Sequence, residues 1–173
     1  MHFRGRERHT VDAKGRTSMS ARFRELLHDA LPAKVANHLV LVPWFGECVR
    51  VYPVGVWDRM VDAFEERLSE FDGFDAGEDE SDLRRVIYGG AIDVHMDGHG
   101  RLVLPKHVRE EIGIEREVYW VGAGRFLELW DPDALHARLG GDRATHLRRQ
   151  LAALGRRRPE PEPVDGADGG ARD

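Results

Sequence analysis

One short pattern occurs twice in this chain, and such a repeat constrains the fold more than any single residue preference does. The stretch VDAKGRTSMSARFR near the amino terminus is echoed, at an offset of 85 residues, by HMDGHGRLVLPKHVR. Both contain Asp-x-x-Gly-Arg, then a short extended run, then the start of a helix. The aligned pairs include Asp12 with Asp97, Gly15 with Gly100, Arg16 with Arg101, and Arg24 with Arg109. We therefore expect two pseudo-symmetric copies of one plan.

The repeat continues at an offset of 78, where HLVLVPWFGECVRVY lies over REVYWVGAGRFLELW. The change of offset corresponds to seven extra residues in the first copy, inside HDALPAKVANH. Each of the two aligned segments holds two apolar runs around a short link with glycine, which predicts a β-hairpin. Asp131 and Pro132 after the second hairpin are expected to open a helix.

The Asp-x-x-Gly stretches predict tight turns. Asp12 and Asp97 can accept hydrogen bonds from backbone amides two residues on, and Gly15 and Gly100 can supply a positive φ. In the following run RLVLP, Leu102 and Leu104 alternate with Arg101 and Val103, as in a half-buried strand. Ser20 suits the N-cap of the next helix in the first copy, and Pro105 suits the first helical turn in the second.

Two segments outside the repeat complete the predicted organisation. Apolar residues recur at helical spacing from Trp57 to Phe71, beneath an acidic back. We expect this stripe and the region from Leu135 to Leu154 to pack between the halves and against neighbouring subunits. The predicted divisions are a first half (1–71), an acidic linker (72–82), a second half (83–155) and a disordered tail (156–173).

Composition limits the classes of protein to which this chain can belong. The 173 residues are 41% hydrophobic, which is enough for a buried core. Cys48 is the single cysteine, so the chain forms no internal disulfide and a reducing cytoplasm is expected. The longest apolar run, Leu39 to Phe45, is far shorter than the roughly 20 residues of a membrane span.

Charge is distributed unevenly, although the formal net charge is only -5. Residues 1–28 hold seven basic and three acidic side chains, whereas residues 58–82 hold two basic and eleven acidic ones. One region can therefore attract phosphate groups while another repels them.

The duplicated Asp-x-x-Gly-Arg, the FRG near the start and the FLELWD that closes the second copy together resemble the MraZ family of bacterial regulators, over roughly residues 1–150. The resemblance implies an α+β fold of the AbrB and MazE type, with two swapped-hairpin (double-psi-like) units forming a small barrel flanked by helices. It also implies a nucleoid-associated repressor of its own division and cell-wall operon. That repressor would be a ring-shaped homo-oligomer that binds short G-rich direct repeats. The sequence departs from the family at Ser20, where proline is common, and at His99, which stands where the first copy has Lys14.

The chemistry of the repeated residues independently favours double-stranded DNA as partner. A two-stranded ribbon fits the major groove, and an arginine just past its turn can donate two parallel hydrogen bonds to guanine. We expect this role for Arg16 and Arg101, although Arg101 has fewer basic neighbours. Asp12, Gly15, Asp97 and Gly100 are expected to shape the turns, and the aspartates to pair with the arginines. Phosphate contacts are predicted for the other basic residues of the first copy: Lys14, Arg4, Arg6, Arg8, Arg22 and Arg24.

Other functions have less support. His95, His99 and His107 straddle a turn and lack a cysteine partner, so we predict neither a metal site nor a cofactor. An acid–base hydrolase using Asp12 and Asp97 would need a nucleophile or metal signature, and we predict no catalytic residue. The remaining alternative is an antitoxin-like module that binds DNA weakly and neutralises a protein partner. Two complete copies in one chain count against that alternative, while the Pro-Glu tail keeps it open.

Overall fold

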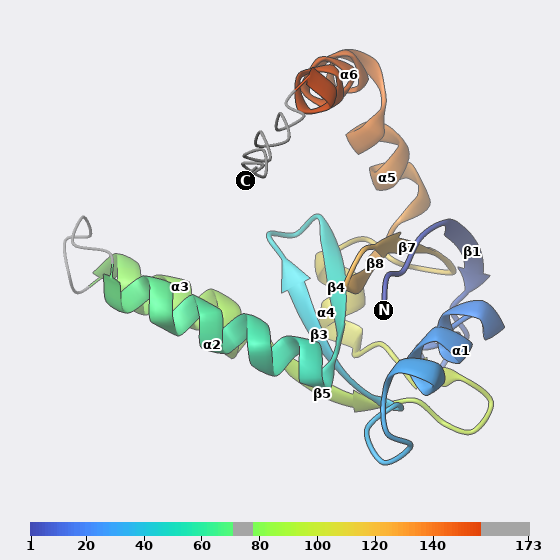
Figure 1. Ribbon diagram of the computed structural model, residues 1–173. Coiled ribbons are helices and arrows are strands. Elements are labelled where there is room, and N and C mark those ends of the chain that lie inside the picture. The colour runs from blue at the N-terminus through green and yellow to red at the C-terminus, as the bar shows by residue number, and fades with distance from the viewer. Residues whose placement is uncertain (71–77, 157–173) are drawn as a thin grey trace, which may run out of the picture. The chain divides into compact units, whose positions relative to one another are not determined.

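The computed structural model describes residues 1–70 and 78–156, which form part of two units spanning 1–135 and 136–173. The first unit contains two β-sheets and helices α1 to α4 (Figure 1). The second contains the end of α5, and α6. In chain order the elements are β1 (Arg6–Thr10), β2 (Arg16–Ser18), α1 (Ala21–Ala30), β3 (His38–Trp44), β4 (Cys48–Pro53), α2 (Val54–Glu70), α3 (Glu78–Gly89), β5 (Ile92–His95), β6 (Arg101–Val103), α4 (Lys106–Glu111), β7 (Glu117–Ala123), β8 (Phe126–Trp130), α5 (Pro132–Leu139) and α6 (Gly141–Arg156).

The larger sheet is antiparallel and has six strands in the order β1-β7-β8-β4-β3-β5. Its centre is built from the two predicted hairpins, β3–β4 and β7–β8, which are confirmed and which join along β4 and β8. Each hairpin gains a strand from the other copy, because β1 pairs with β7 and β5 pairs with β3. The two halves of the chain therefore share one sheet.

The smaller sheet pairs β2 with β6, so it too takes one strand from each copy. We call this two-stranded sheet the ribbon. Within the described residues, β1 is not paired with β2 across the first turn, where an isolated bridge joins Val11 to Thr17, and β5 is not paired with β6 across the second. A three-residue strand buries little surface by itself. Pairing β2 with β6 lets both strands bury their inner side chains on the same core.

The expected α+β class is confirmed, whereas the expected small barrel is not closed in the part of the chain that the structure describes. Within residues 1–70 and 78–156, β1 and β5 stay at opposite edges of the larger sheet. The ribbon does not close the gap, since β2 and β6 hydrogen-bond to each other as a separate sheet. The swapped-hairpin, double-psi-like description stays a prediction.

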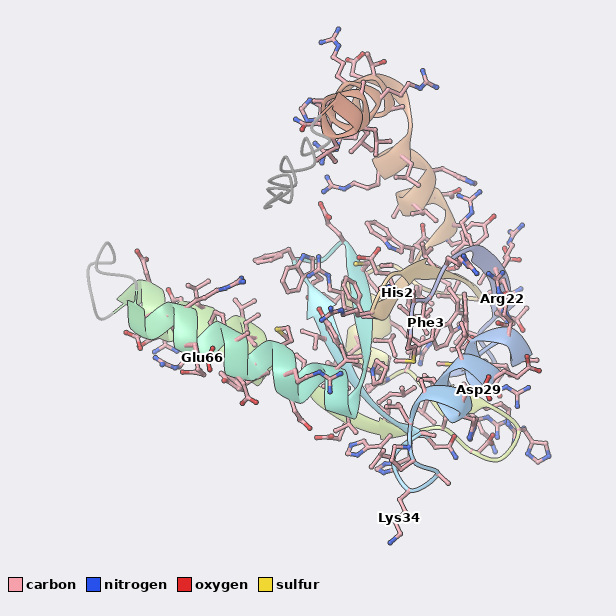
Figure 2. The ribbon with its side chains drawn as sticks, in the orientation of Figure 1. His2, Phe3, Arg22, Asp29, Lys34 and Glu66 are labelled. Atoms are coloured by element: carbon pink, nitrogen blue, oxygen red, sulfur yellow. The ribbon has the colours of Figure 1, made fainter. Side chains whose placement is uncertain are left out.

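The main core lies between the ribbon and the inner face of the larger sheet. Trp120 and Leu129 are fully buried on that face, and the indole Nε1 of Trp120 donates to the hydroxyl of Thr17, 3.5 Å away on the ribbon. Helix α1 closes one side of the core through Phe23, whose ring meets that of Phe3 edge to face at 5.9 Å. Figure 2 shows Phe3 in this interior and Lys34 projecting outward from the loop after α1.

Helix α2 and the start of α5, up to Leu135, cover parts of the outer face of the larger sheet. Trp57 and Met60 of α2, two residues of the predicted apolar stripe, pack against a cluster that includes Val40 and Tyr52. Leu135 of α5 packs in a separate cluster with Cys48 and Trp130. The cluster under α2 also includes Ala91 and Phe126 of the second half, so part of the predicted stripe packs where the two halves meet. The last residue of that stripe, Phe71, lies outside the described residues.

Helices α2 and α3 run alongside each other and extend away from the sheet (Figure 1). Glu65 joins them by accepting hydrogen bonds from the guanidinium of Arg84 and the hydroxyl of Tyr88, at 2.7 Å in each case. The Arg84 hydrogen bond lowers the pKa of Glu65. Residues 78–82 of the predicted acidic linker form the start of α3. The rest of that linker (72–77) and the tail after residue 156 lie outside the described residues.

The helix starts follow the local signals in the sequence. Ser20 is the N-cap of α1, as predicted, and its hydroxyl accepts from the amide of Phe23. Asp131 opens α5 by accepting from the amides of Asp133 and Ala134. Pro105 occupies the N-cap of α4 and not its first turn. In the part of the chain that the structure describes, no helix combines the length and apolarity needed to cross a membrane.

We expect the shared core to control stability. Leu129 is fully buried, so Leu129→Ala should lower the free energy of unfolding by about 2–5 kcal/mol. The same truncation at Leu139, which is 47% exposed, should change it by less than about 0.5 kcal/mol. Urea unfolding followed by circular dichroism measures both variants. Equal losses for the two would contradict the placement of the core.

Candidate nucleic-acid interface

The outer face of the ribbon carries one arginine from each copy. Arg16 pairs with Val103, and Ser18 pairs with Arg101, so these four side chains share a face. It is the outward face, since Val103 is 50% exposed while Thr17 and Leu102, on the opposite face, are buried. Arg16 and Arg101 are diagonal neighbours, whose Cα atoms are typically about 7–8 Å apart. The alternation predicted for residues 101–104 is thus confirmed.

A carboxylate organises the first turn. The Oδ1 atom of Asp12 accepts from the amides of Lys14 and Arg16, each at 2.9 Å. Its Oδ2 atom accepts from both Nε and Nη2 of the Arg16 guanidinium at 2.7 Å. Backbone bonds complete the turn, because the amide of Gly15 donates to the Asp12 carbonyl and the amide of Asp12 donates to the Arg16 carbonyl. The same residue therefore shapes the turn and holds the arginine side chain.

The second turn repeats this geometry. Asp97 Oδ1 accepts from the amides of His99 at 2.8 Å and Arg101 at 3.0 Å, and Oδ2 accepts from the Arg101 guanidinium at 2.8 Å. The side chains of Arg16 and Arg101 are 36% and 40% exposed. Replacing Lys14 by His99 leaves the turn intact, because only the backbone amide at that position is used. The two copies therefore present equivalent arginines.

The pairing with aspartate leaves one end of each guanidinium available. Nε and Nη2 face the carboxylate, whereas Nη1 makes no hydrogen bond within the described residues. The pair of N–H groups at the tip, one on Nη1 and one on Nη2, can still donate in parallel to two acceptors. The expected ion pair is observed, and it is compatible with a ligand contact, because the aspartate fixes the direction of the fork.

The turn hydrogen bonds keep both aspartates ionised. The backbone amide of Arg101, and then its guanidinium, lower the pKa of Asp97 to about 2 from an ordinary value of 3.8. The equivalent donors of Arg16 lower the pKa of Asp12. Both carboxylates are therefore charged at neutral pH. Neither is suited to general acid chemistry there.

An arginine from the helix of each copy lies over the turn glycine of the other copy. A Cβ atom on Gly100 would meet Cδ and Nε of Arg24 at 2.4 and 2.5 Å. A Cβ on Gly15 would meet Nε of Arg109 at 3.1 Å, and also the Leu104 carbonyl at 2.8 Å. Both glycines have positive φ angles, +78° and +79°, as the turn prediction required. The local sequence around Arg109 does not predict a role in the site, although its alignment with Arg24 in the repeat indicates one.

The other predicted phosphate ligands are spread over a wider surface. Arg6 and Arg8 project from β1, where Arg6 stacks on Tyr119 at 4.9 Å and Arg8 forms an ion pair with Glu117. Arg22, at the start of α1, has its guanidinium beside Gly5. Arg4 and Lys14 are exposed. The structure thus brings Arg16 and Arg101 together on the ribbon and leaves Arg6 and Arg8 on the larger sheet.

The three histidines considered as metal ligands have separate environments. His95 stacks on His38 across strands β5 and β3, with ring centroids 4.5 Å apart. His99 lies in the second turn, and His107 lies on α4. Among residues 1–70 and 78–156, no cluster of three or more histidine, cysteine or carboxylate side chains could hold a metal ion.

Comparisons with known proteins agree on one family. A family model described as "MraZ protein, putative antitoxin-like" matches residues 87–151, which include the second turn. The chain is 35% identical over 131 residues to the transcriptional regulator MraZ of Nitrosospira multiformis, covering 76% of this chain and 82% of that protein. It is also 35% identical over 137 residues to that of Methylobacillus flagellatus, covering 79% and 86%. For the Pseudomonas aeruginosa protein the identity is 32% over 143 residues, covering 82% and 88%.

Because the Arg24 side chain lies against Gly100, we predict that adding a side chain at position 100 lowers the free energy of unfolding. Gly100 and Gly124 share a φ of +79°, but a Cβ on Gly124 would meet nothing within 4 Å. Gly124→Ala should therefore cost only the conformational term, about 1–2 kcal/mol. Gly100→Ala should cost about 1–3 kcal/mol more, because Arg24 must move. Chemical denaturation of both variants tests this difference, and equal costs would contradict the contact.

The low pKa of Asp97 predicts how its turn responds to acid. Because the folded-state pKa lies below the ordinary value, the carboxylate stabilises the fold above about pH 4, and this contribution is lost as the pH falls through about 2. An NMR titration of the carboxyl carbon should give a midpoint near 2 in the parent chain. In Arg101→Ala the midpoint should rise towards 3.8. A parent midpoint near 4 would show that the hydrogen bonds do not persist in solution.

Proposed function

This chain belongs to the MraZ family of transcriptional regulators, and on that basis we propose that it binds double-stranded DNA through the outer face of the β2–β6 ribbon. The observation that carries the proposal is the pair of aspartate-oriented arginines on one exposed face. A two-stranded ribbon matches the width of the major groove, and two guanidinium groups on diagonal positions can enter the same groove.

The proposed base contact uses the free tip of each arginine. Two parallel N–H groups match the O6 and N7 acceptors of guanine. Arginine suits this task better than lysine, because its planar fork is fixed whereas an ammonium group acts as a point charge. The bond to Asp12 or Asp97 holds the fork before DNA arrives, which lowers the conformational entropy lost on binding. Arg16 and Arg101 thus contribute specificity.

Phosphate contacts supply much of the affinity in this proposal. Lys14, Arg4, Arg6, Arg8 and Arg22 are exposed and can neutralise backbone phosphates without distinguishing sequence. For Arg24, also predicted as a phosphate ligand, we propose no phosphate contact, because its side chain is half-buried against Gly100. The acidic α2 and α3 helices are repelled by the duplex, which limits the orientations in which the protein can bind.

Further features follow from the small size of the ribbon. Two arginines contact only a few base pairs, so useful specificity requires several copies on repeated sites, where linked binding events multiply affinity. From the membership in the MraZ family, and not from the geometry of the ribbon, we infer a ring-shaped homo-oligomer bound to short G-rich direct repeats. Its operator would precede its own division and cell-wall operon, and the protein would act there as a nucleoid-associated repressor. Footprinting on the DNA upstream of its own gene tests this assignment.

A protein-binding role of the antitoxin class is the second candidate, and the description of the matching family model favours it. In that case the ribbon would bind duplex DNA weakly and without base preference. Base-specific binding that depends on the ribbon arginines therefore separates the two candidates.

Arg16→Ala and Arg101→Ala should each weaken binding to the footprinted duplex by about 1–3 kcal/mol per lost guanine contact. Their affinity for a duplex of unrelated sequence should change much less. Lys14→Ala should weaken both duplexes similarly and reduce the salt dependence, because a phosphate contact is lost. Fluorescence anisotropy at several salt concentrations measures these effects.

Arg85→Ala is the matched control, since Arg85 lies on α3 and its side chain is 72% exposed. Its affinity for either duplex should equal that of the parent chain. The proposal is refuted if Arg16→Ala and Arg101→Ala both bind the footprinted duplex as tightly as this control.

A further inference from the structure

We propose that Arg24 and Arg109 are positioning residues that act across the two copies: Arg24 orients Arg101, and Arg109 orients Arg16. This inference rests on the proposed DNA contact of the ribbon arginines. Neither positioning residue needs to touch a base. Each acts through the turn glycine that precedes the arginine of the other copy.

The contact of Arg24 with the second turn is close. Its Cδ, Nε and Cζ atoms lie 2.4, 2.5 and 2.9 Å from the position that a Gly100 Cβ would occupy. Gly100 is buried and directly precedes Arg101. The first copy also holds this glycine through its backbone, because the amide of Met19 donates to the Gly100 carbonyl at 2.8 Å. The second turn is therefore packed between the Asp97 carboxylate and side-chain and backbone groups of the first copy.

The first turn is held in the reciprocal way. The amide of Leu104 donates to the Gly15 carbonyl at 2.8 Å, and Nε of Arg109 lies 3.1 Å from the position of a Gly15 Cβ. Arg109 is anchored further, because its Nε donates to the Leu104 carbonyl at 3.2 Å. The buried Nε of Arg24 has no hydrogen-bond partner within the described residues. Packing alone therefore holds the Nε atom of Arg24 in place. We expect Arg24 to be displaced from its turn more easily than Arg109, which is held by a hydrogen bond.

The geometry explains why such cover would affect DNA binding. Each aspartate fixes its arginine relative to the turn, but the turn itself must be fixed relative to the ribbon. A hydrogen bond to guanine requires a donor–acceptor distance of about 2.7–3.2 Å, so a shift of the turn by 1 Å would remove it. Arg24 and Arg109 limit that shift because their side chains lie against the turn glycines Gly100 and Gly15. Because each comes from the other copy, each ribbon arginine is positioned by a residue of the opposite half of the chain.

Double-mutant cycles on the full chain test the pairing of roles. Arg24→Ala should weaken binding to the footprinted duplex, and combining it with Arg101→Ala should cost less than the product of the two single losses, by roughly threefold or more. Combining it with Arg16→Ala should give the full product. Arg109→Ala should show the opposite pattern, with coupling to Arg16 and none to Arg101. A role in stability alone would not make Arg24 couple only to Arg101 and Arg109 only to Arg16.

A second measurement needs no DNA. In NMR spectra of the free protein, Arg24→Ala should shift the Gly100 amide and Arg101 Nε–H signals and leave those of Gly15 and Arg16 unchanged. Arg22→Ala, two residues earlier on the same helix, is the matched control and should alter neither turn. Shifts without specific DNA binding by the parent would count against the proposed function and leave the packing role standing.

Two outcomes would overturn the inference. One is a pair of unchanged turn spectra in Arg24→Ala and Arg109→Ala. The other is full additivity of Arg24→Ala with both ribbon arginines, together with a smaller salt dependence, which would identify Arg24 as a phosphate ligand. Thermal unfolding of each variant, followed by circular dichroism, shows whether the fold is retained during these measurements.

Discussion

The pairing of β2 with β6 is the interaction on which the rest of the structure depends. Each strand has only three residues. Within the described residues, neither strand forms a sheet with the strand on the other side of its own Asp-x-x-Gly turn. By pairing with each other, the two strands bury Thr17 and Leu102 on the core and expose Arg16 and Arg101 on the other face. This short contact adds to the pairing of the copies in the larger sheet, closes the core beneath Trp120 and assembles the candidate interface.

The aspartates of the repeated motif serve the direction of the arginines more than the stability of the fold. Both ion pairs are partly exposed, and exposed pairs contribute at most about 1 kcal/mol. The same carboxylates also accept two backbone amide bonds each, which explains the local geometry of the turn. An arginine held in this way has fewer conformations to lose when it binds. The arginines that form these structural ion pairs are thus also the proposed DNA-binding groups.

Throughout the first unit, each copy contributes strands and side chains to the structure of the other copy. The larger sheet takes β1 and β5 from opposite halves, and each turn glycine lies under an arginine of the other half. A chain with only one copy would lack the second strand of the ribbon and the cover of its turn. Two such copies could meet only by association, whereas a single chain holds them at high effective concentration. The internal repeat is therefore a structural requirement of this interface.

The sequence alone determined the local features of this protein. Each of these features depends on residues close together in the chain and was predictable for that reason. They are the turn-opening Asp12 and Asp97, the positive-φ Gly15 and Gly100, the N-cap Ser20, the alternation of Leu102 and Leu104, and the two central hairpins. The choice of strand partner depended on contacts between residues 51 to 115 positions apart, such as Arg16 with Val103, which local patterns do not encode. Tertiary structure alone therefore decided that the larger sheet stays open and that the two arginines share one face. It also decided that Arg24 and Arg109 cover each other's turns, because that arrangement follows from which buried surfaces pack together and not from any single motif.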